Sequence, residues 1–361
     1  MKKRFLKALF IILSVFVFIA CADPVVQGDR LSIHFLELGN RYTGDSVYIN
    51  YGDIDILIDA GSKHDSAPVI MAYIDRYMQD QKLEFVIATH AHEDHIAGFY
   101  SNYWIPGIFD VYDIGIIIDF PKTHKTIPVP PVTTVYGNYV ISRADAVAKG
   151  AVHYTALQCY REEDGAQRVY NLGGGVFLEI LYNYYYENET PDVNDENDYS
   201  VCIRIDDNGR QYLFTGDLEQ IGEDKLVAYY QANHGGLGYC TLYKGGHHGS
   251  RTSSHEALMA AITPEYVIVC SCVGSSEYGA RPENTFPSQD FINRIAPYTS
   301  NVYLTTLVSN YYDNQYSSFN GNIIFSVLNN GQISVRGSNN SIKLKDTAWF
   351  RDNRTMPPEW L

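Results

Sequence analysis

The sequence predicts a mixed α/β protein in which helices cover the faces of β-sheets. Apolar runs of strand length alternate along the chain with segments of helical periodicity. Turn-forming residues such as Gly and Asn separate these segments. The chain has 361 residues, 45% of them apolar, which is enough for a sizeable core. A wholly disordered chain is therefore excluded.

The first predicted elements lead to a run of histidines. Strand-forming composition predicts strands at 31–38, 46–51 and 54–59, and helical spacing of apolar residues predicts a helix at 69–78. A short apolar strand at 85–88 ends directly before the histidines. Because α/β folds place active-site residues where strands end, this position favours a functional site.

The remaining elements continue the same alternation. Residues 105–127 contain strand-forming patches, and the prolines of 128–135 predict a loop. A helix at 140–149 is expected to be capped by Ser142 and ended by Gly150. The polar, acidic and aromatic segment 183–198 predicts an exposed loop. Further strands are expected at 176–182, 201–205, 211–215, 239–243, 266–272, 302–306, 322–328 and 332–336, and further helices at 221–232, 254–262 and 289–295.

The N-terminus predicts export. Lys and Arg side chains precede an apolar run at 8–20, which is too short for an ordinary spanning helix. The run ends at Ala20-Cys21, and 18–21 is similar to a bacterial lipobox, with a plain signal peptide as the alternative. We therefore expect a lipoprotein signal peptide at 1–20, a tether at 21–30, a hydrolase domain at 31–340 and a tail at 341–361. The mature protein would lie outside the cytoplasm, anchored in the cell envelope by lipid on Cys21.

The net charge limits the kinds of binding partner that we expect, and the cysteine content indicates whether disulfides form. Loss of the signal removes four basic residues and lowers the formal charge from −15 to −19. A broad nucleic-acid-binding surface is not expected at this charge, although a phosphate-bearing substrate could still be held by metals. The five cysteines after Cys21 form no disulfide framework, and Cys202, Cys270 and Cys272, which lie in apolar strand-like runs, are expected to be buried thiols.

The histidine run predicts a metal centre. In Thr89-His90-Ala91-His92-Glu93-Asp94-His95, three imidazoles and a carboxylate fall within six positions. These donors suit zinc or a similar divalent ion, with manganese as an alternative. Packing explains such a density poorly. A hydrolytic site follows, because a divalent metal lowers the pKa of bound water.

Two later segments supply further candidates. Asp217 follows a strand and Gly216, and beside the first cluster a bridging ligand is favoured over a simple turn residue. The segment 244–250 places His247 and His248 between glycines, so one can ligate a metal while the other reaches the substrate. Asp59 ends a buried strand and is predicted to accept a hydrogen bond from a ligand imidazole.

Other histidines and tyrosines are assigned structural roles. His124, His153 and His255 keep a small chance of being extra ligands. Tyrosines at 182 and 184–186 are expected to fill an exposed loop, with substrate contact as the alternative.

Together these residues resemble the metallo-β-lactamase fold superfamily, whose signature is His90-x-His92-x-Asp94-His95. The branch they look most like is the extracytoplasmic hydrolase domain of ComEC and its stand-alone relatives. The further matching segments are 31–39, 44–46, 57–61, 197–200, 215–217 and 244–250. Two departures are the extra residues 40–43 in the opening turn and Phe286, where the branch commonly has the histidine of His-Pro-Ser.

The resemblance implies an αββα sandwich with two metals at one edge. His90 and His92 would hold one metal and Asp94 and His95 the other, with Asp217 between them. Either His247 or His248 would complete the shell.

With His247 as the ligand, His248 would join Asp94 and Asp217 in catalysis by metal-bound hydroxide. Lys244 and Ser250 would bind the anionic group. If the histidine replaced by Phe286 is a ligand in relatives, the second zinc would be weakly held.

Three functions follow as hypotheses. The first is a phosphodiesterase that acts on nucleic acid or on a phosphorylated envelope polymer, such as phosphorylcholine-bearing teichoic acid. The second is a hydrolase of a lactone, β-lactam or other carboxylic derivative. The third is a non-catalytic binding lipoprotein with a degenerate site.

Overall fold

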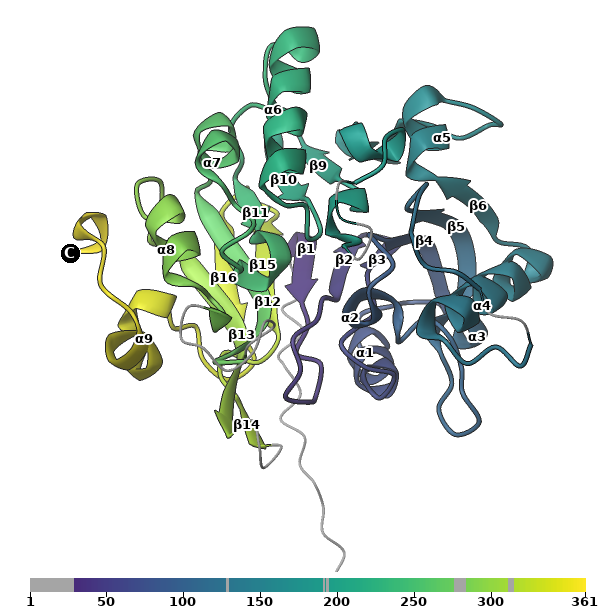
Figure 1. The fold of residues 1–361 in the computed structure, drawn as a ribbon, viewed down its shortest axis with the longest axis horizontal. Coiled ribbons are helices and arrows are strands. Elements are labelled where there is room, and N and C mark those ends of the chain that lie inside the picture. Colours follow the sequence, from purple (N-terminus) through teal and green to yellow (C-terminus); the bar gives the residue numbers. More distant parts are fainter. Residues whose placement is uncertain (1–28, 128–129, 191, 193–194, 276–283, 311–314) are drawn as a thin grey trace, which may run out of the picture.

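The computed structural model describes residues 29–361 except 128–129, 191, 193–194, 276–283 and 311–314 (Figure 1). The expected signal peptide at 1–20 lies outside the described residues, as does most of the expected tether at 21–30. None of the helices formed by the described residues has the length and hydropathy needed to cross a bilayer.

The described strands form two mixed sheets. In spatial order the first contains β16 (Ile333–Gly337), β15 (Ile323–Leu328), β1 (Asp29–Phe35), β2 (Val47–Tyr51), β3 (Ile54–Ile58), β4 (Lys82–Ala88), β5 (Asp113–Asp119) and β6 (Val152–Thr155). The second contains β14 (Gln315–Ser318), β13 (Val302–Asn310), β12 (Tyr266–Val273), β11 (Leu242–Lys244), β10 (Arg210–Phe214), β9 (Ile203–Asp207), β8 (Val176–Ile180) and β7 (Val169–Gly173). Parallel pairing runs from β3 to β6 and from β10 to β13.

Helices cover the outer faces of these sheets (Figure 1). On the side of the first sheet lie α1 (Ser66–Ile74), α2 (Glu93–Ile96), α3 (Ile108–Val111) and α4 (Val135–Lys149). On the side of the second lie α6 (Gln220–His234), α7 (Glu256–Ile262) and α8 (Gln289–Ile295). Two short helices, α5 (Ala156–Arg161) and α9 (Ala348–Asn353), complete the set.

The sheets pack face to face through an apolar core. The ring of Tyr212 on β10 lies 5.5 Å from that of Phe325 on β15, one strand from each sheet. A second apolar cluster joins α6, α7 and α8 to the outer face of the second sheet, with Leu226, Leu258 and Phe291 fully buried there. The predicted αββα sandwich is therefore confirmed, and the burial of two apolar faces per sheet accounts for the long apolar strands.

Three local predictions need correction. Helix α4 begins at Val135 rather than 140, because the Thr134 hydroxyl accepts from Gly137 N and caps it, while Ser142 lies inside the helix. The described residues of segment 183–198 do not form a wholly exposed loop: Tyr185 and Tyr186 are buried, and the Tyr186 hydroxyl accepts from Cys202 N at 3.0 Å. Burial of these aromatic rings outweighs the polar composition of the segment.

The last residues are also folded. The segment expected to be a tail, 341–361, contains α9 and ends in a short turn at Pro358–Trp360. The Trp360 ring is buried against Phe350, and its indole N–H donates to Thr299 O at 2.9 Å. This segment therefore packs beside α8 and β13 as part of the second layer.

Strand direction determines where the site lies. Because β10, β11 and β12 run parallel, their carboxyl ends reach one edge of the second sheet, and β3 and β4 end at the corresponding edge of the first. Val201 N donates to Thr89 O at 2.9 Å and joins the two sheets at this edge. Segments 215–217 and 244–250 therefore meet the histidine run.

Candidate metal centre

The first histidine cluster lies in the turn between β4 and α2. His90 follows the strand, His92 is the N-cap of α2, and Asp94 and His95 lie in its first turn. His90 Nε2 lies 3.0 Å from His92 Nδ1, and the rings of His90 and His95 lie 4.1 Å apart. The strand and the short helix thus place His90 beside His92 and His95.

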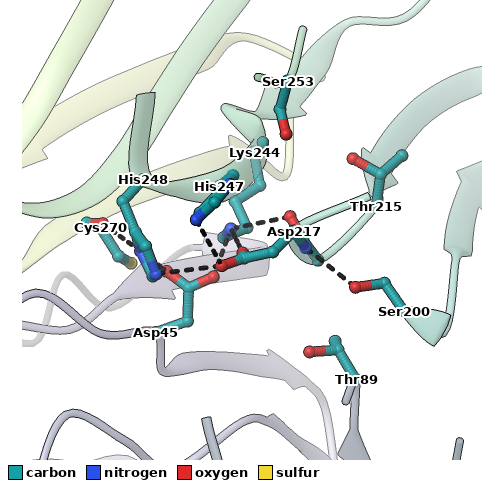
Figure 2. Close-up of polar contacts among 12 residues, drawn as sticks. Asp45, Thr89, Ser200, Thr215, Asp217, Lys244, His247, His248, Ser253 and Cys270 are labelled. Atoms are coloured by element: carbon teal, nitrogen blue, oxygen red, sulfur yellow. Dashed lines mark hydrogen bonds and ion pairs between the residues drawn. The ribbon is translucent and has the colours of Figure 1, made fainter. Parts of the chain in front are cut away.

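Asp217 is the carboxylate that links the segments. Its Oδ2 lies 3.1 Å from His95 Nε2, 3.2 Å from His248 Nε2 and 3.8 Å from His247 Nε2. The backbone N of Asp217 donates to Ser200 Oγ at 3.0 Å, a contact drawn in Figure 2. This central position is the one that a bridging ligand requires.

Glycine is needed immediately before Asp217. Gly216 has a φ of +56°, and a Cβ at this position would lie 2.7 Å from Ser200 Oγ. Any other residue would be strained and would push Ser200 away from the Asp217 amide. The Gly216-Asp217 pair is therefore a single geometric unit.

The two adjacent histidines face different partners. His248 Nε2 lies 3.4 Å from Asp94 Oδ2, and its Nδ1 lies 3.2 Å from Asp45 Oδ1. His247 directs Nδ1 to Thr252 Oγ1 at 3.0 Å and to Glu219 at 3.4 Å. Of the two, His248 belongs to the groups of donor atoms close enough to share a metal, whereas His247 lies beside those groups.

The backbone of both histidines is left-handed. His247 has a φ of 43° and His248 a φ of 53°. Such conformations cost roughly 1–3 kcal/mol for a residue with a Cβ and persist where the surroundings enforce them. Here the enforcement includes donation from His247 N to Gly216 O at 3.3 Å and from Ser250 N to His247 O at 2.7 Å.

Asp59 lies where a partner for a ligand imidazole is needed. Its Oδ2 lies 2.8 Å from His95 Nδ1. It also accepts from Thr89 N at 2.7 Å and from Thr89 Oγ1 at 2.8 Å. These contacts direct Nε2 of His95 toward Asp217.

Lys244 and Ser250 are both buried at the site. Lys244 is only 2% exposed and forms an ion pair with the Asp45 carboxylate; its Nζ also lies 3.9 Å from Asp217 Oδ1 (Figure 2). Ser250 is buried and bonds Thr252 Oγ1 at 3.1 Å. Both side chains are therefore engaged in contacts within the site, and their expected role in binding an anionic substrate stays a prediction.

Asp45 is the residue that sequence reasoning missed. Its carboxylate contacts Lys244 and His248, and its Oδ2 lies 3.9 Å from His95 Nδ1. The signal was present in Gly44-Asp45-Ser46, where an acidic residue directly precedes a buried strand. Glycine is required at position 44, because a Cβ there would lie 2.5 Å from the Ser62 backbone.

Neighbouring groups of opposite charge determine the direction in which the pKa values of His95 and Asp217 shift. Burial lowers the pKa of His95, but Asp217 and Asp59 outweigh burial and hold it well above its usual range. Burial raises the pKa of Asp217, but His248 and His95 hold it well below its usual range. His90 shows the opposite balance: burial and the nearby His95 lower its pKa strongly. A bound divalent cation would take over the role of the protons on these imidazoles.

The donor set fits a divalent metal. Four groups of three side chains have donor atoms within 4.8 Å of one another: His90, His95 and Asp217; Asp94, His95 and His248; Asp45, Asp59 and His95; and Asp45, Asp217 and His248. Within the described residues, the buried Asp217 Oδ1 makes no hydrogen bond, and His248 Nε2 has only the carboxylates of Asp217 and Asp94 beside it. Buried polar atoms without such partners are the atoms that a cation would satisfy.

The remaining candidates lie elsewhere. His153 Nε2 lies 2.8 Å from Asp119, and His124 Nε2 lies 3.0 Å from Tyr199 Oη. His255 is the N-cap of α7. Phe286 does reach the site: its ring centroid lies 6.0 Å from that of His248 and 6.3 Å from that of His247. An apolar ring therefore packs on the paired histidines.

A buried carboxyl beside the site predicts pH-dependent stability. Glu223 on α6 accepts from Ser254 N at 2.6 Å and His255 N at 2.7 Å, and burial raises its pKa from 4.5 to about 8. The folded protein then holds this proton to higher pH than the unfolded chain. The resulting stability is complete below about pH 4.5 and is lost as pH rises through about 8.

We expect Glu223→Gln to remove this slope. The parent should lose at least ~1.4 kcal/mol of unfolding free energy between pH 5 and pH 9 relative to the variant, since one pKa unit corresponds to that energy. The variant itself should be about 1 kcal/mol less stable at pH 5, because an amide offers one acceptor fewer. Guanidinium unfolding at both pH values measures the difference, and parallel profiles would contradict it.

Comparison with known proteins agrees with this geometry. The family model for the metallo-beta-lactamase superfamily matches residues 39–101, which contain Asp45, Asp59 and the histidine cluster. Over these residues the chain resembles the metallo-β-lactamase superfamily, and its two-sheet fold and donor set agree with that resemblance. It is also similar to competence and recombination proteins, as the resemblance to the ComEC-like branch predicts.

The similarity to these relatives is local. The chain is 40% identical over 77 residues to Competence protein ComA of Neisseria gonorrhoeae, which is 21% of this chain and 11% of that protein. It is 27% identical over 113 residues to ComE operon protein 3 of Bacillus subtilis, 31% of this chain and 14% of that protein. It is 30% identical over 107 residues to Recombination protein 2 of Haemophilus influenzae, 30% of this chain and 12% of that protein. The chain thus spans only a small part of these relatives.

Solved structures are similar over more of the chain. The match to the metallo-beta-lactamase fold protein YhfI of Bacillus subtilis covers 81% of this chain and 98% of the YhfI chain, with a TM-score of 0.43 and 12% sequence identity. Metallo-beta-lactamase SMB-1 covers 61% of this chain and 78% of its own, with a TM-score of 0.35 and 13% identity.

Proposed function

We propose that the chain is a metal-dependent phosphodiesterase that works outside the cytoplasm. The observation that carries the proposal is the convergence of three histidines and two carboxylates, His90, His95, His248, Asp94 and Asp217, at one sheet edge. The names of the relatives, which refer to competence and recombination, favour a phosphodiester over a β-lactam.

Two metal positions share one carboxylate in this proposal. His90, His92 and Asp217 would hold the first ion, and Asp94, His95 and His248 the second, with Asp217 between them. A divalent metal bound there would polarise the phosphoryl group and supply activated water near neutral pH. Zinc suits these donors, with manganese as the alternative.

We assign to His247 the role of proton donor to the leaving group. Its Nδ1 is held by Thr252 and Glu219, while Nε2 faces Asp217 at 3.8 Å. Hydrolysis adds a water oxygen to phosphorus and breaks one P–O ester bond, and the leaving oxygen needs a proton. An imidazole fixed at this place can donate that proton.

The buried charges keep the donors in place. Asp45 forms an ion pair with Lys244 and also contacts His248. The Asp59 carboxylate contacts the imidazole of His95. Few donors can therefore rotate away before a metal binds, which lowers the free-energy cost of assembling the site.

One side-by-side assay tests the function. The mature protein is loaded with zinc or manganese, the metal per chain is counted, and bis-p-nitrophenyl phosphate, a phosphorylcholine ester and a chromogenic β-lactam are supplied as substrates. We expect metal-dependent cleavage of a phosphodiester. Cleavage of the β-lactam alone would overturn the proposal, and absence of both metal and turnover would favour a binding protein.

We also propose that lipid on Cys21 anchors the enzyme to the envelope membrane, on the evidence of the apolar run that ends at this residue. Fractionation of cells that express Cys21→Ala tests the anchor. Full retention of the variant in the membrane fraction would refute it.

A further inference from the structure

A pocket of about 490 Å³ adjoins the histidine run. Its lining includes Ala91 and Glu93, which alternate in sequence with His90, His92 and Asp94. The other walls come from the segment before α4 and from the turn before η2 (Asn197–Tyr199). A substrate that reaches the donor set from this side would place one of its substituents in the pocket.

A buried glutamate lies in the wall of this pocket. Glu196 is only 1% exposed, and its Oε1 accepts from His124 N at 3.0 Å. Within the described part of the chain, its Oε2 makes no hydrogen bond. A buried acceptor without a partner costs about 1–3 kcal/mol, and more if it is charged, so a ligand that donates to it would recover that cost.

The side chains around Glu196 indicate which chemical class of ligand the pocket would bind. Lys125 and Thr126 contribute donors at the exposed rim, and the half-buried ring of Tyr136 supplies an apolar face. Glu93 is already paired with Lys63 at 2.6 Å, which leaves Glu196 as the buried acceptor in this wall. Mixed donors and acceptors around an aromatic face suit a polyhydroxylated group better than a purely cationic or apolar one.

We propose that this pocket binds the alcohol portion of the substrate and selects a sugar or polyol, with Glu196 as the acceptor for its hydroxyls. The inference rests on the proposed phosphodiesterase function and names the substrate class for that same site. The volume of about 490 Å³ is sufficient for a hexose ring. Glu196 acts in specificity and is not assigned a role at the phosphoryl group.

A matched pair of substrates tests the proposal on the metal-loaded protein. Methyl glucoside 6-(p-nitrophenyl phosphate) and cyclohexylmethyl p-nitrophenyl phosphate share a six-membered ring and a leaving group, but only the first has hydroxyls. We expect kcat/KM to be at least about tenfold higher for the glucoside, since one recovered charge-assisted hydrogen bond corresponds to that factor. Equal kcat/KM values for the two would overturn the inference.

The variant Glu196→Gln should reduce that preference about tenfold, because a neutral amide accepts a weaker hydrogen bond. It keeps an oxygen for His124 N and so should still fold. The exposed Glu163→Gln serves as the matched control and should keep the parental ratio. An unchanged ratio in Glu196→Gln would exclude the carboxylate as the selective group.

Calorimetry separates this inference from the proposed function. Glucose 6-phosphate should bind the metal-loaded parent about tenfold more tightly than cyclohexylmethyl phosphate, and Glu196→Gln should reduce that ratio. This binding preference can be measured without turnover. If no phosphodiester is cleaved but the binding preference is observed, the phosphodiesterase function is refuted and the assignment of the pocket is supported. If a phosphodiester is cleaved without any preference for the sugar, only the assignment of the pocket is refuted.

Discussion

Replacement of Asp217 by alanine should abolish metal-dependent hydrolysis. Its Oδ2 lies within 3.2 Å of both His95 Nε2 and His248 Nε2, so its loss removes the carboxylate that joins the two groups of donors. We expect turnover to fall more than about a hundredfold, beyond the 10–100-fold typical of losing an outer partner of a ligand. Metal content per chain should fall in parallel.

Control variants make this result specific. Asp224→Asn changes an exposed carboxylate on α6 and should leave both quantities unchanged. His248→Ala should lower the metal content, whereas His247→Ala should lower kcat with the metal retained, because only His248 lies beside Asp94. Retention of more than roughly a tenth of the activity in Asp217→Ala would refute the bridging role.

Substitution of Asp45 by asparagine should destabilise the protein by about 3–5 kcal/mol, the range found when one member of a buried ion pair is removed. The reason is Lys244, which is 2% exposed and would be left as a buried ammonium without its carboxylate. Burial lowers the pKa of Lys244, but Asp45 and Asp217 together outweigh burial and hold it above its usual value, so the pair is charged in the folded protein.

A double-mutant cycle measures the coupling of this pair. Lys244→Met should be destabilising by itself, and the Asp45→Asn, Lys244→Met double variant should recover much of the summed loss, because no uncompensated charge remains. Guanidinium unfolding of chelator-treated protein gives the four free energies. Strictly additive losses would show that the two residues do not act as a pair.

The two buried residues of this pair show the limit of sequence reasoning. Lys244 lies beside two histidines in a glycine-rich segment, which made an anion-binding lysine the natural prediction. The partner that changes this interpretation, Asp45, lies far away in sequence and reaches Lys244 only because the β1–β2 connection and the end of β11 meet between the sheets.

Glu196 illustrates the same limit in another way. It belongs to a polar, acidic segment whose composition predicts solvent exposure, yet it is buried. The tyrosines of that segment provide the reason, since Tyr185 and Tyr186 bury their rings and draw the backbone inward. Composition averages over such a segment and misses the few side chains that determine its burial.

By itself the sequence determined the fold class, most strands and helices, and the residue types of a metal centre, because hydrophobic periodicity and a dense local run of histidines depend on neighbours in the chain. Only the tertiary structure decided that His248 contacts Asp94, that Lys244 is committed to Asp45, and that Glu196 lies in the wall of a pocket. Each of these depends on contacts between segments far apart in sequence, and such contacts are determined by how the two sheets pack.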